Sequence, residues 1–322
     1  MLCLNETDIS QAAELEDLTA AVEAALILYE KKEFKMPMRM HTDYQGNTLL
    51  LMPCFTKKRF STKLVSLFPE NVRKNLPVLM GTVILNDGKT GEPLALLNGA
   101  KLTALRTGAV GGVGVRYLTS PDVQSIGIVG AGVQNLHQVL FACRERPISR
   151  VFVYDQLPEK AYSLMQKLVI LLPGITIYQA ESTEDLLKEC ELIIAATNAT
   201  EPVFPDNHEL LRGKHFIGIG SYKPDMREFP ESLFKLLDEI FVDTEHAIEE
   251  SGDLIDPLKY NWLKREQVLT LGKLIMGNKK IKPDSGTTTL FKSVGMALFD
   301  LMAADLIYQK ALQKRLGTRI DL

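Results

Sequence analysis

The chain has 322 residues, 46% of them hydrophobic, which is more than one ordinary hydrophobic core needs and predicts two domains. A formal net charge of −3 argues against binding to nucleic-acid phosphates or to an anionic membrane surface. No apolar run approaches the roughly 20 residues of a membrane span. The N-terminus lacks a signal-peptide pattern. Four widely spaced cysteines with no C-x-x-C pair indicate free thiols in the cytoplasm and no metal site.

The first part of the chain mixes helix and strand. Apolar residues at helical spacing predict a helix over residues 15–29. Short apolar segments predict strands, and two of them flank the turn-forming residues 86–91, which indicates a hairpin. This order favours an antiparallel or mixed sheet. The predicted strands cover residues 48–52, 62–68, 79–85 and 94–97.

From about Asp122 the pattern changes to strands that alternate with helices, which is typical of a parallel sheet. The tail, residues 287–315, has apolar residues at helical spacing and predicts a long helix that returns to the first domain. The first domain would then be discontinuous. The predicted strands of this second part cover residues 125–129, 151–154, 192–196, 215–219 and 240–242.

A G-x-G motif, Gly130 to Gly132, lies between a predicted strand and a predicted helix. Glycines at this point let a pyrophosphate approach the N–H groups of a helix N-terminus. Asn135 replaces the third glycine of the full motif, but Asp155 ends the next predicted strand, about 20 residues further on, where a ribose-binding acid is expected. The alternative is an ordinary turn in which Asp155 only caps a helix.

Asp155 also bears on the choice of cofactor. A carboxylate accepts hydrogen bonds from the ribose hydroxyls of NAD and repels the 2′-phosphate of NADP. The three residues that follow it, 156–158, include no arginine. The sequence therefore favours NAD(H) over NADP(H).

Three cations, Arg39, Lys63 and Arg106, stand in apolar surroundings with no acidic residue in the same stretches. A buried cation is costly unless it is paired. The carboxylate of a ligand would supply the missing anion, since an arginine fork matches a carboxylate with two hydrogen bonds. The alternative for each cation is that it reaches the surface or pairs with a distant Asp or Glu.

These features resemble the ornithine cyclodeaminase/mu-crystallin family. The most specific likenesses are the L-T-x-x-R-T-G-A segment within 102–109 and the F-K-S-x-G segment over 291–295. Together the similar segments extend from about residue 39 to residue 310. They cover residues 61–65, 81–83, 100–109, 130–134, 220–228 and 289–295.

The resemblance implies an α/β fold and a homodimer. A Rossmann dinucleotide-binding domain would cover residues 121–297. A discontinuous α+β domain for substrate binding and dimerisation would combine 1–120 with 298–322. It also implies that Arg39, Lys63 and Arg106 hold the substrate carboxylate, with Lys63 next to the reacting carbon. The positions expected at the cofactor are Thr107, Gly130, Gly132, Val133, Gln134, Asp155, Thr197 and Ser293, and those expected beside the substrate are Val294 and Gly295.

The family's activities differ, and one segment indicates which applies. Cyclodeaminases and the related alanine dehydrogenase resemble one another in an aspartate two residues before Pro224, where this chain has Tyr222. Asp225, just after that proline, resembles the pattern of ketimine reductases. We therefore expect Lys63 and Asp225 to serve the reduction of a cyclic ketimine. Asp225 would offset the charge of a protonated imine, unless it only caps a helix.

The expected substrate is a small imino acid, Δ1-pyrroline-2-carboxylate or Δ1-piperideine-2-carboxylate, reduced to L-proline or L-pipecolate. Three alternatives stay open at this point. They are an ornithine cyclodeaminase that uses NAD+ catalytically, an alanine dehydrogenase-like enzyme, and a crystallin-like protein that binds a ligand without turnover.

Overall fold

The computed structural model describes residues 1–277 and 286–321. The chain forms two compact units: one contains residues 1–106 and 296–322, and the other contains residues 107–295. The division falls inside helix α3 (Gly99–Leu118), whereas the expected domain boundary followed residue 120. Among the described residues, none of the helices combines the length and apolar character that crossing a bilayer requires.

The first unit is built on a seven-stranded mixed sheet with strand order β15-β1-β6-β5-β4-β3-β2. Strands β2 to β6 pair antiparallel with their neighbours, while β1 pairs parallel to β6. The predicted hairpin over β5 and β6 is confirmed. The strands are β1 (Leu2–Leu4), β2 (Met40–Tyr44), β3 (Asn47–Phe55), β4 (Arg59–Leu67), β5 (Leu79–Asp87), β6 (Pro93–Asn98) and β15 (Thr318–Arg319).

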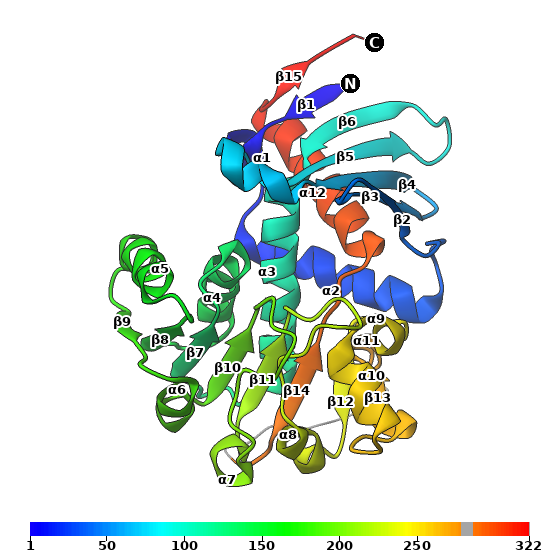
Figure 1. The fold of residues 1–322 in the computed structure, drawn as a ribbon. Helices are drawn as coiled ribbons and strands as arrows, with labels where there is room; N and C mark the ends of the chain where they lie inside the picture. Colours follow the sequence, from blue (N-terminus) through cyan, green and yellow to red (C-terminus); the bar gives the residue numbers. More distant parts are fainter. Residues whose placement is uncertain (278–285, 322) are drawn as a thin grey trace. The chain divides into compact units, whose positions relative to one another are not determined.

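Helix α12 (Ala297–Lys314) covers one face of this sheet, packing on β3, β4 and β5 and against α2 (Figure 1). Strand β4 explains why that face is a core: Ser61, Lys63 and Val65 alternate along it, and all three are buried. Lys63 therefore lies on the same face as an apolar layer. The other helical segments of the first unit are α1 (Glu6–Ala12), α2 (Leu15–Lys31) and a 3₁₀ turn at Pro69–Lys74.

The second unit holds an eight-stranded sheet with strand order β13-β12-β14-β11-β10-β7-β8-β9. All its neighbouring pairs are parallel, as a dinucleotide-binding fold requires. The strands are β7 (Ser125–Val129), β8 (Arg150–Tyr154), β9 (Thr176–Gln179), β10 (Leu192–Ala195), β11 (His215–Gly218), β12 (Ile240–Val242), β13 (Val268–Thr270) and β14 (Thr289–Lys292).

Strand β14 corrects the prediction that residues 287–315 form one long helix. Its four residues are all buried and pair with β11 and β12 inside the sheet, and the helix begins only at Ala297. A short, fully buried strand has no polar face, so its pattern cannot be told from that of a buried helix. The α/β class with one parallel and one mixed sheet is confirmed.

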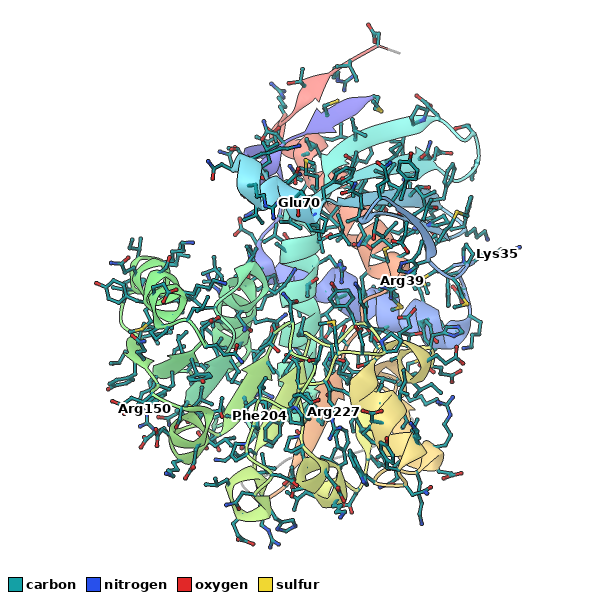
Figure 2. The ribbon with its side chains drawn as sticks, viewed as in Figure 1. Lys35, Arg39, Glu70, Arg150, Phe204 and Arg227 are labelled. Carbon is teal, nitrogen blue, oxygen red and sulfur yellow. The ribbon has the colours of Figure 1, made fainter. Side chains whose placement is uncertain are left out.

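Helices follow the parallel strands of the second unit, as a sheet buried on both faces needs. In the core of this unit, Phe204, labelled in Figure 2, stacks on Phe229 at 5.7 Å, and both rings meet Phe216 of β11 edge-on. The helices are α4 (Val133–Glu145), α5 (Pro158–Leu171), α6 (Thr183–Glu189), α7 (His208–Leu211), α8 (Glu231–Leu236), α9 (Ala247–Glu250), α10 (Gly252–Lys259) and α11 (Leu271–Ile275), with a 3₁₀ turn at Arg265–Gln267.

Candidate functional site

A pocket of about 940 Å³ opens at the carboxyl ends of β7, β8 and β10 in the second unit. This is the place where open parallel sheets bind ligands. Its lining includes five residues that the sequence assigned to the cofactor: Gly130, Gly132, Val133, Asp155 and Thr197. The volume lies in the range of small-molecule and cofactor sites.

The glycine loop between β7 and α4 fits a pyrophosphate. Gly130 has a φ of +92°, and a Cβ there would lie 2.9 Å from the carbonyl oxygen of Ala196. Gly132 is the N-cap of α4, with no side chain capping the helix and open space around its Cβ position. The first N–H groups of the helix are therefore accessible to an anion.

Asn135 explains the missing third glycine. Its side-chain amide donates to the carbonyl oxygens of Val129 at 2.8 Å and of Gly130 at 2.5 Å. The carbonyl of Val129 also accepts from the N–H of Ala196 at 3.2 Å, so the amide adds a second hydrogen bond there and supplies one to the carbonyl of Gly130 in the turn. The loop is thus held by a buried side chain at the position where the full motif has glycine.

Asp155 lies at the end of β8 and contacts the glycine loop directly. One carboxylate oxygen accepts from the N–H of Ala131 at 2.7 Å, and the other accepts from the N–H of Leu157 at 2.9 Å. The second contact closes a turn before α5, whose N-cap is Leu157 with no side-chain cap, so the alternative that Asp155 only caps a helix is wrong. Lys160 and Lys167 of α5 also line the pocket. This positive charge was not predicted, because both lysines lie beyond the three residues that follow Asp155.

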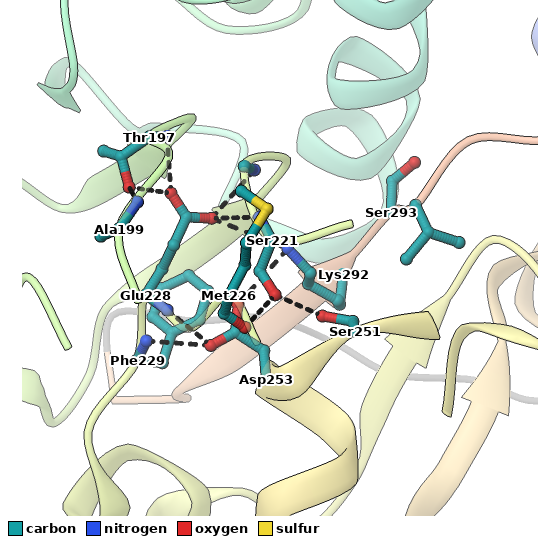
Figure 3. Close-up of polar contacts among 12 residues, drawn as sticks. Thr197, Ala199, Ser221, Met226, Glu228, Phe229, Ser251, Asp253, Lys292 and Ser293 are labelled. Atoms are coloured by element: carbon teal, nitrogen blue, oxygen red, sulfur yellow. Dashed lines mark hydrogen bonds and ion pairs between the residues drawn. The ribbon is translucent and has the colours of Figure 1, made fainter. Parts of the chain in front are cut away.

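Residues 196–203 form one wall of the pocket, and the buried carboxylate of Glu228 accepts hydrogen bonds from this wall (Figure 3). One oxygen of Glu228 accepts from both the N–H of Thr197, at 2.7 Å, and its hydroxyl, at 2.9 Å. The other oxygen accepts from the N–H groups of Gly220 and Ser221, at 2.9 and 3.2 Å. Glu228 therefore joins the loops that follow β10 and β11.

The charge of Glu228 is balanced by Lys292 of β14, which is completely buried. The ammonium of Lys292 lies 3.6 Å from Glu228 and 3.4 Å from Asp253 (Figure 3). Asp253 in turn accepts from the N–H groups of Glu228 and Phe229. Burial raises the pKa of Asp253, against the opposing charge of Lys292. This network links two of the segments that carried the family resemblance.

Residues 293–295 are held by Asp243, which directly follows β12. One oxygen of Asp243 accepts from the hydroxyl of Ser293 at 2.6 Å and from the N–H groups of Val294 and Gly295 at 3.1 and 2.7 Å. Gly295 has a φ of +76°, a conformation that glycine adopts most easily. The loop expected beside cofactor and substrate is thus rigidly organised by a residue that the sequence pattern did not single out.

The remaining predicted residues of the second unit differ in exposure. Val133 is exposed at the start of α4, while the side-chain oxygen of Gln134 is buried without a hydrogen-bond partner in the described part of the chain. Thr107 is buried, and its carbonyl accepts from Gln138 at 2.8 Å. Asp225 is exposed in a turn, and the next helix, α8, begins only at Glu231, so the helix-cap alternative for Asp225 is wrong.

Two of the three predicted cations come together inside the first unit. The ammonium of Lys63 lies 2.7 Å from one carboxylate oxygen of Asp300, and Nε of Arg106 lies 2.9 Å from the other. All three side chains are at least nine-tenths buried. The expectation that only a ligand supplies the counter-charge is therefore wrong for Lys63 and Arg106, and the alternative of a distant acid holds. Asp300 belongs to α12, some 200 residues further along the chain.

Lys63, Arg106 and Asp300 form a cationic cluster, and Arg39 acts on it through its charge. Burial lowers the pKa of Lys63 to about 8, with the attraction of Asp300 opposing this effect and the charges of Arg106 and Arg39 adding to it. Burial alone would raise the pKa of Asp300, but Arg106 and Lys63 hold it below its usual value. Arg39 is half-buried in the segment before β2 (Figure 2). All three cations therefore act on one place in the first unit.

Asp300 could have been found by the criterion that found the cations. It stands between Phe299 and Leu301 in an apolar stretch of the sequence, where an acid also needs a partner. The local sequence carries no comparable signal for Asp243, because one aspartate after a short strand is common in turns.

Comparison with known proteins identifies the family of the chain. The family model of the ornithine cyclodeaminase/mu-crystallin family matches residues 1–315. The chain is 31% identical to Delta(1)-pyrroline-2-carboxylate reductase of Bacillus cereus, with all of both chains covered. The solved structure of Thermococcus litoralis Delta(1)-pyrroline-2-carboxylate reductase with NADH and L-proline is 34% identical, with a TM-score of 0.92 over 99% of this chain and 100% of that one.

An archaeal alanine dehydrogenase dimer with bound NAD is 27% identical, with a TM-score of 0.91 over 100% of this chain and 99% of that one. Its fold is therefore shared along the whole length. Taken together, the match of the family model and the full-length identity show that the chain belongs to the ornithine cyclodeaminase/mu-crystallin family.

Proposed function

We propose that the protein reduces a cyclic ketimine carboxylate, Δ1-pyrroline-2-carboxylate or Δ1-piperideine-2-carboxylate, to L-proline or L-pipecolate with NADH. The observation that carries the proposal is the buried cluster of Lys63, Arg106 and Asp300, in a chain that also has a dinucleotide pocket. Sequence identities of 31% and 34%, over nearly the full length, to two Delta(1)-pyrroline-2-carboxylate reductases support the choice of substrate.

The charges of the cluster suit a small carboxylate. Asp300 contacts both Lys63 and Arg106, so its single negative charge is shared between two positive charges, and the charge of Arg39 acts on Lys63 as well. Within the described residues, Arg106 donates a hydrogen bond only through Nε. Its two terminal nitrogens remain for the paired hydrogen bonds that a carboxylate accepts.

Lys63 is the candidate for the proton that an imine nitrogen needs. With a pKa of about 8, it is mostly protonated at neutral pH and is a stronger acid than an ordinary lysine. NADH supplies the hydride that the carbon of the C=N bond accepts. The bound carboxylate would hold the ring in one orientation. Asp225 is proposed to offset the charge of the protonated imine.

The pocket of the second unit is proposed to prefer NAD(H). Asp155 would accept hydrogen bonds from the adenosine ribose, once its contacts with Ala131 and Leu157 are shared or exchanged. Val133, Gln134 and Thr197 would lie along the cofactor. Lys160 and Lys167 lessen the repulsion of a 2′-phosphate, so we expect a preference for NADH rather than exclusion of NADPH.

We also propose that the protein is a homodimer joined through the first unit. Strands β2 to β5 present a row of exposed apolar side chains on the face opposite Lys63. An exposed apolar face of this kind is typical of an interaction surface. The archaeal alanine dehydrogenase described above is a dimer. The side chains are Met40, Leu49, Leu64, Met80 and Ile84.

The proposal is tested by a matrix of cofactors and substrates with the purified protein. NADH and NADPH would each be offered with the five-membered ketimine, the six-membered ketimine, and pyruvate plus ammonia, and NAD+ would be offered with ornithine. We expect oxidation of NADH by at least one ketimine to exceed every other reaction. Rapid release of ammonia from ornithine would instead identify a cyclodeaminase, and efficient use of pyruvate would identify an alanine dehydrogenase.

A further inference from the structure

One acidic side chain in the cationic cluster has no part in the reaction as proposed above. We propose that Asp300 is a positioning residue that sets Lys63 and Arg106 for the bound imino acid, holding each cation through a separate carboxylate oxygen. The inference rests on the proposed function, because it assigns these two cations to the substrate.

The geometry separates the two tasks of the carboxylate. Oδ2 lies 2.7 Å from the ammonium of Lys63, and Oδ1 lies 2.9 Å from Nε of Arg106. Asp300 accepts a hydrogen bond from Nε of Arg106, so the terminal nitrogens of the guanidinium remain for another carboxylate. The two cations come from β4 and α3, and among the described residues Asp300 of α12 is the only acid in direct contact with both.

The charges around Lys63 give Asp300 a second effect. Arg106 of α3 and Arg39 before β2 both disfavour the protonated lysine, and Asp300 of α12 favours it. From β3, Cys54 is a neutral thiol, because burial, with a contribution from Asp300, raises its pKa to about 12. Removing the charge of Asp300 would remove the attraction that opposes burial and the charges of Arg106 and Arg39, so Lys63 would lose its proton at lower pH.

A matched control lies on the same helix. Asp305 of α12 pairs with Arg59 of β4 at 3.2 Å, so it joins the same two elements as the pair of Asp300 with Lys63. Asp305 is more exposed and is outside the cluster. Asp305→Asn therefore shows whether loss of a contact between α12 and β4 by itself changes binding of a ligand, whereas loss of positioning would change binding only in Asp300→Asn.

The experiment uses the full-length protein and measures binding of pyrrole-2-carboxylate, a planar carboxylate probe, by calorimetry from pH 6 to pH 9. In the wild type, affinity should fall as pH rises through about 8, where Lys63 loses its charge. In Asp300→Asn the fall should move to lower pH by about 1–3 units. In Asp305→Asn it should stay in place. An unchanged pH dependence in folded Asp300→Asn would overturn the proposal.

Turnover of the ketimine with NADH gives the second readout. We expect kcat/KM of Asp300→Asn at pH 7.5 to fall at least about tenfold, and that of Asp305→Asn to stay within about twofold of the wild type. If the wild type binds the probe with the expected pH dependence but reduces no ketimine, the proposed function fails and the assignment of Asp300 stands.

If Asp300→Asn does not fold, Asp300→Glu replaces it. This variant keeps the charge but changes the reach of the carboxylate. If Asp300 is a positioning residue, Asp300→Glu should bind the probe more weakly than the wild type, and its affinity should fall at the same pH as in the wild type. Wild-type affinity together with a lowered melting temperature would show that Asp300 only stabilises the fold.

Discussion

Replacing Arg106 by leucine separates the binding role of this residue from its structural role. The substitution removes a cation that is almost fully buried and leaves Asp300 with Lys63, at 2.7 Å, as its remaining partner. Breaking a buried pair completely costs about 3–5 kcal/mol. Because Lys63 still compensates the carboxylate, we expect Arg106→Leu to lower the free energy of unfolding by about 3 kcal/mol or less.

The effect on catalysis should be larger. Loss of a charge-assisted contact to the substrate carboxylate costs about 2–5 kcal/mol in the transition state, which corresponds to a kcat/KM about 30-fold to about 4,000-fold lower. Urea unfolding followed by circular dichroism gives the first quantity, and initial rates with the ketimine and NADH give the second. Arg59→Leu is the control, because Arg59 also pairs with an acid of α12 and lies outside the cluster.

In Arg59→Leu we expect a stability loss of about 1 kcal/mol or less and an unchanged kcat/KM. If folded Arg106→Leu retains the kcat/KM of the wild type, then Arg106 serves only to hold α12 through Asp300, and the assignment of Arg106 to the substrate is wrong.

Three further predictions concern the cofactor, the buried network and pH. Asp155→Ser combined with Gln156→Arg should raise the kcat/KM ratio of NADPH to NADH; a wild type that already prefers NADPH strongly would refute the role given to Asp155. Lys292→Met leaves two adjacent carboxylates buried without their cation and should lower the free energy of unfolding by about 3–5 kcal/mol in urea titrations, whereas Lys188→Met, which removes an exposed side chain of α6, should change it by less than about 0.5 kcal/mol. The kcat/KM of ketimine reduction should decrease as pH rises through about 8, because Lys63, whose pKa burial lowers, loses its proton there; a flat profile to pH 9.5 would exclude Lys63 as the proton donor.

The sequence predicted the features that depend on local pattern. The strand before Gly130, the helix after Gly132 and the approach of Asp155 to the glycine loop all follow from residues close together in the chain. The hairpin of β5 and β6 was predictable for the same reason. Strand β14 was not, because four buried residues next to an apolar helix lack a period of their own.

Which charged residues pair with one another could not be predicted, because the partners are distant in sequence, even where each residue, such as Asp300, stands out in an apolar stretch. Asp300 meets Lys63 and Arg106 only because α12 returns to pack on the first sheet. Lys292 meets Glu228 and Asp253 only because β14 lies inside the second sheet. Local sequence shows that a buried charge needs a partner, but tertiary packing decides which residue it is.

The most direct test of the proposed reduction is the transfer of deuterium from labelled NADH. The protein would be incubated with Δ1-pyrroline-2-carboxylate and NADH deuterated at the transferable position, and the proline formed would be analysed by mass spectrometry. We predict L-proline with a single deuterium at the α-carbon, formed as fast as NADH is consumed. Unlabelled product, or no proline from the ketimine while ornithine and NAD+ release ammonia, would contradict the account.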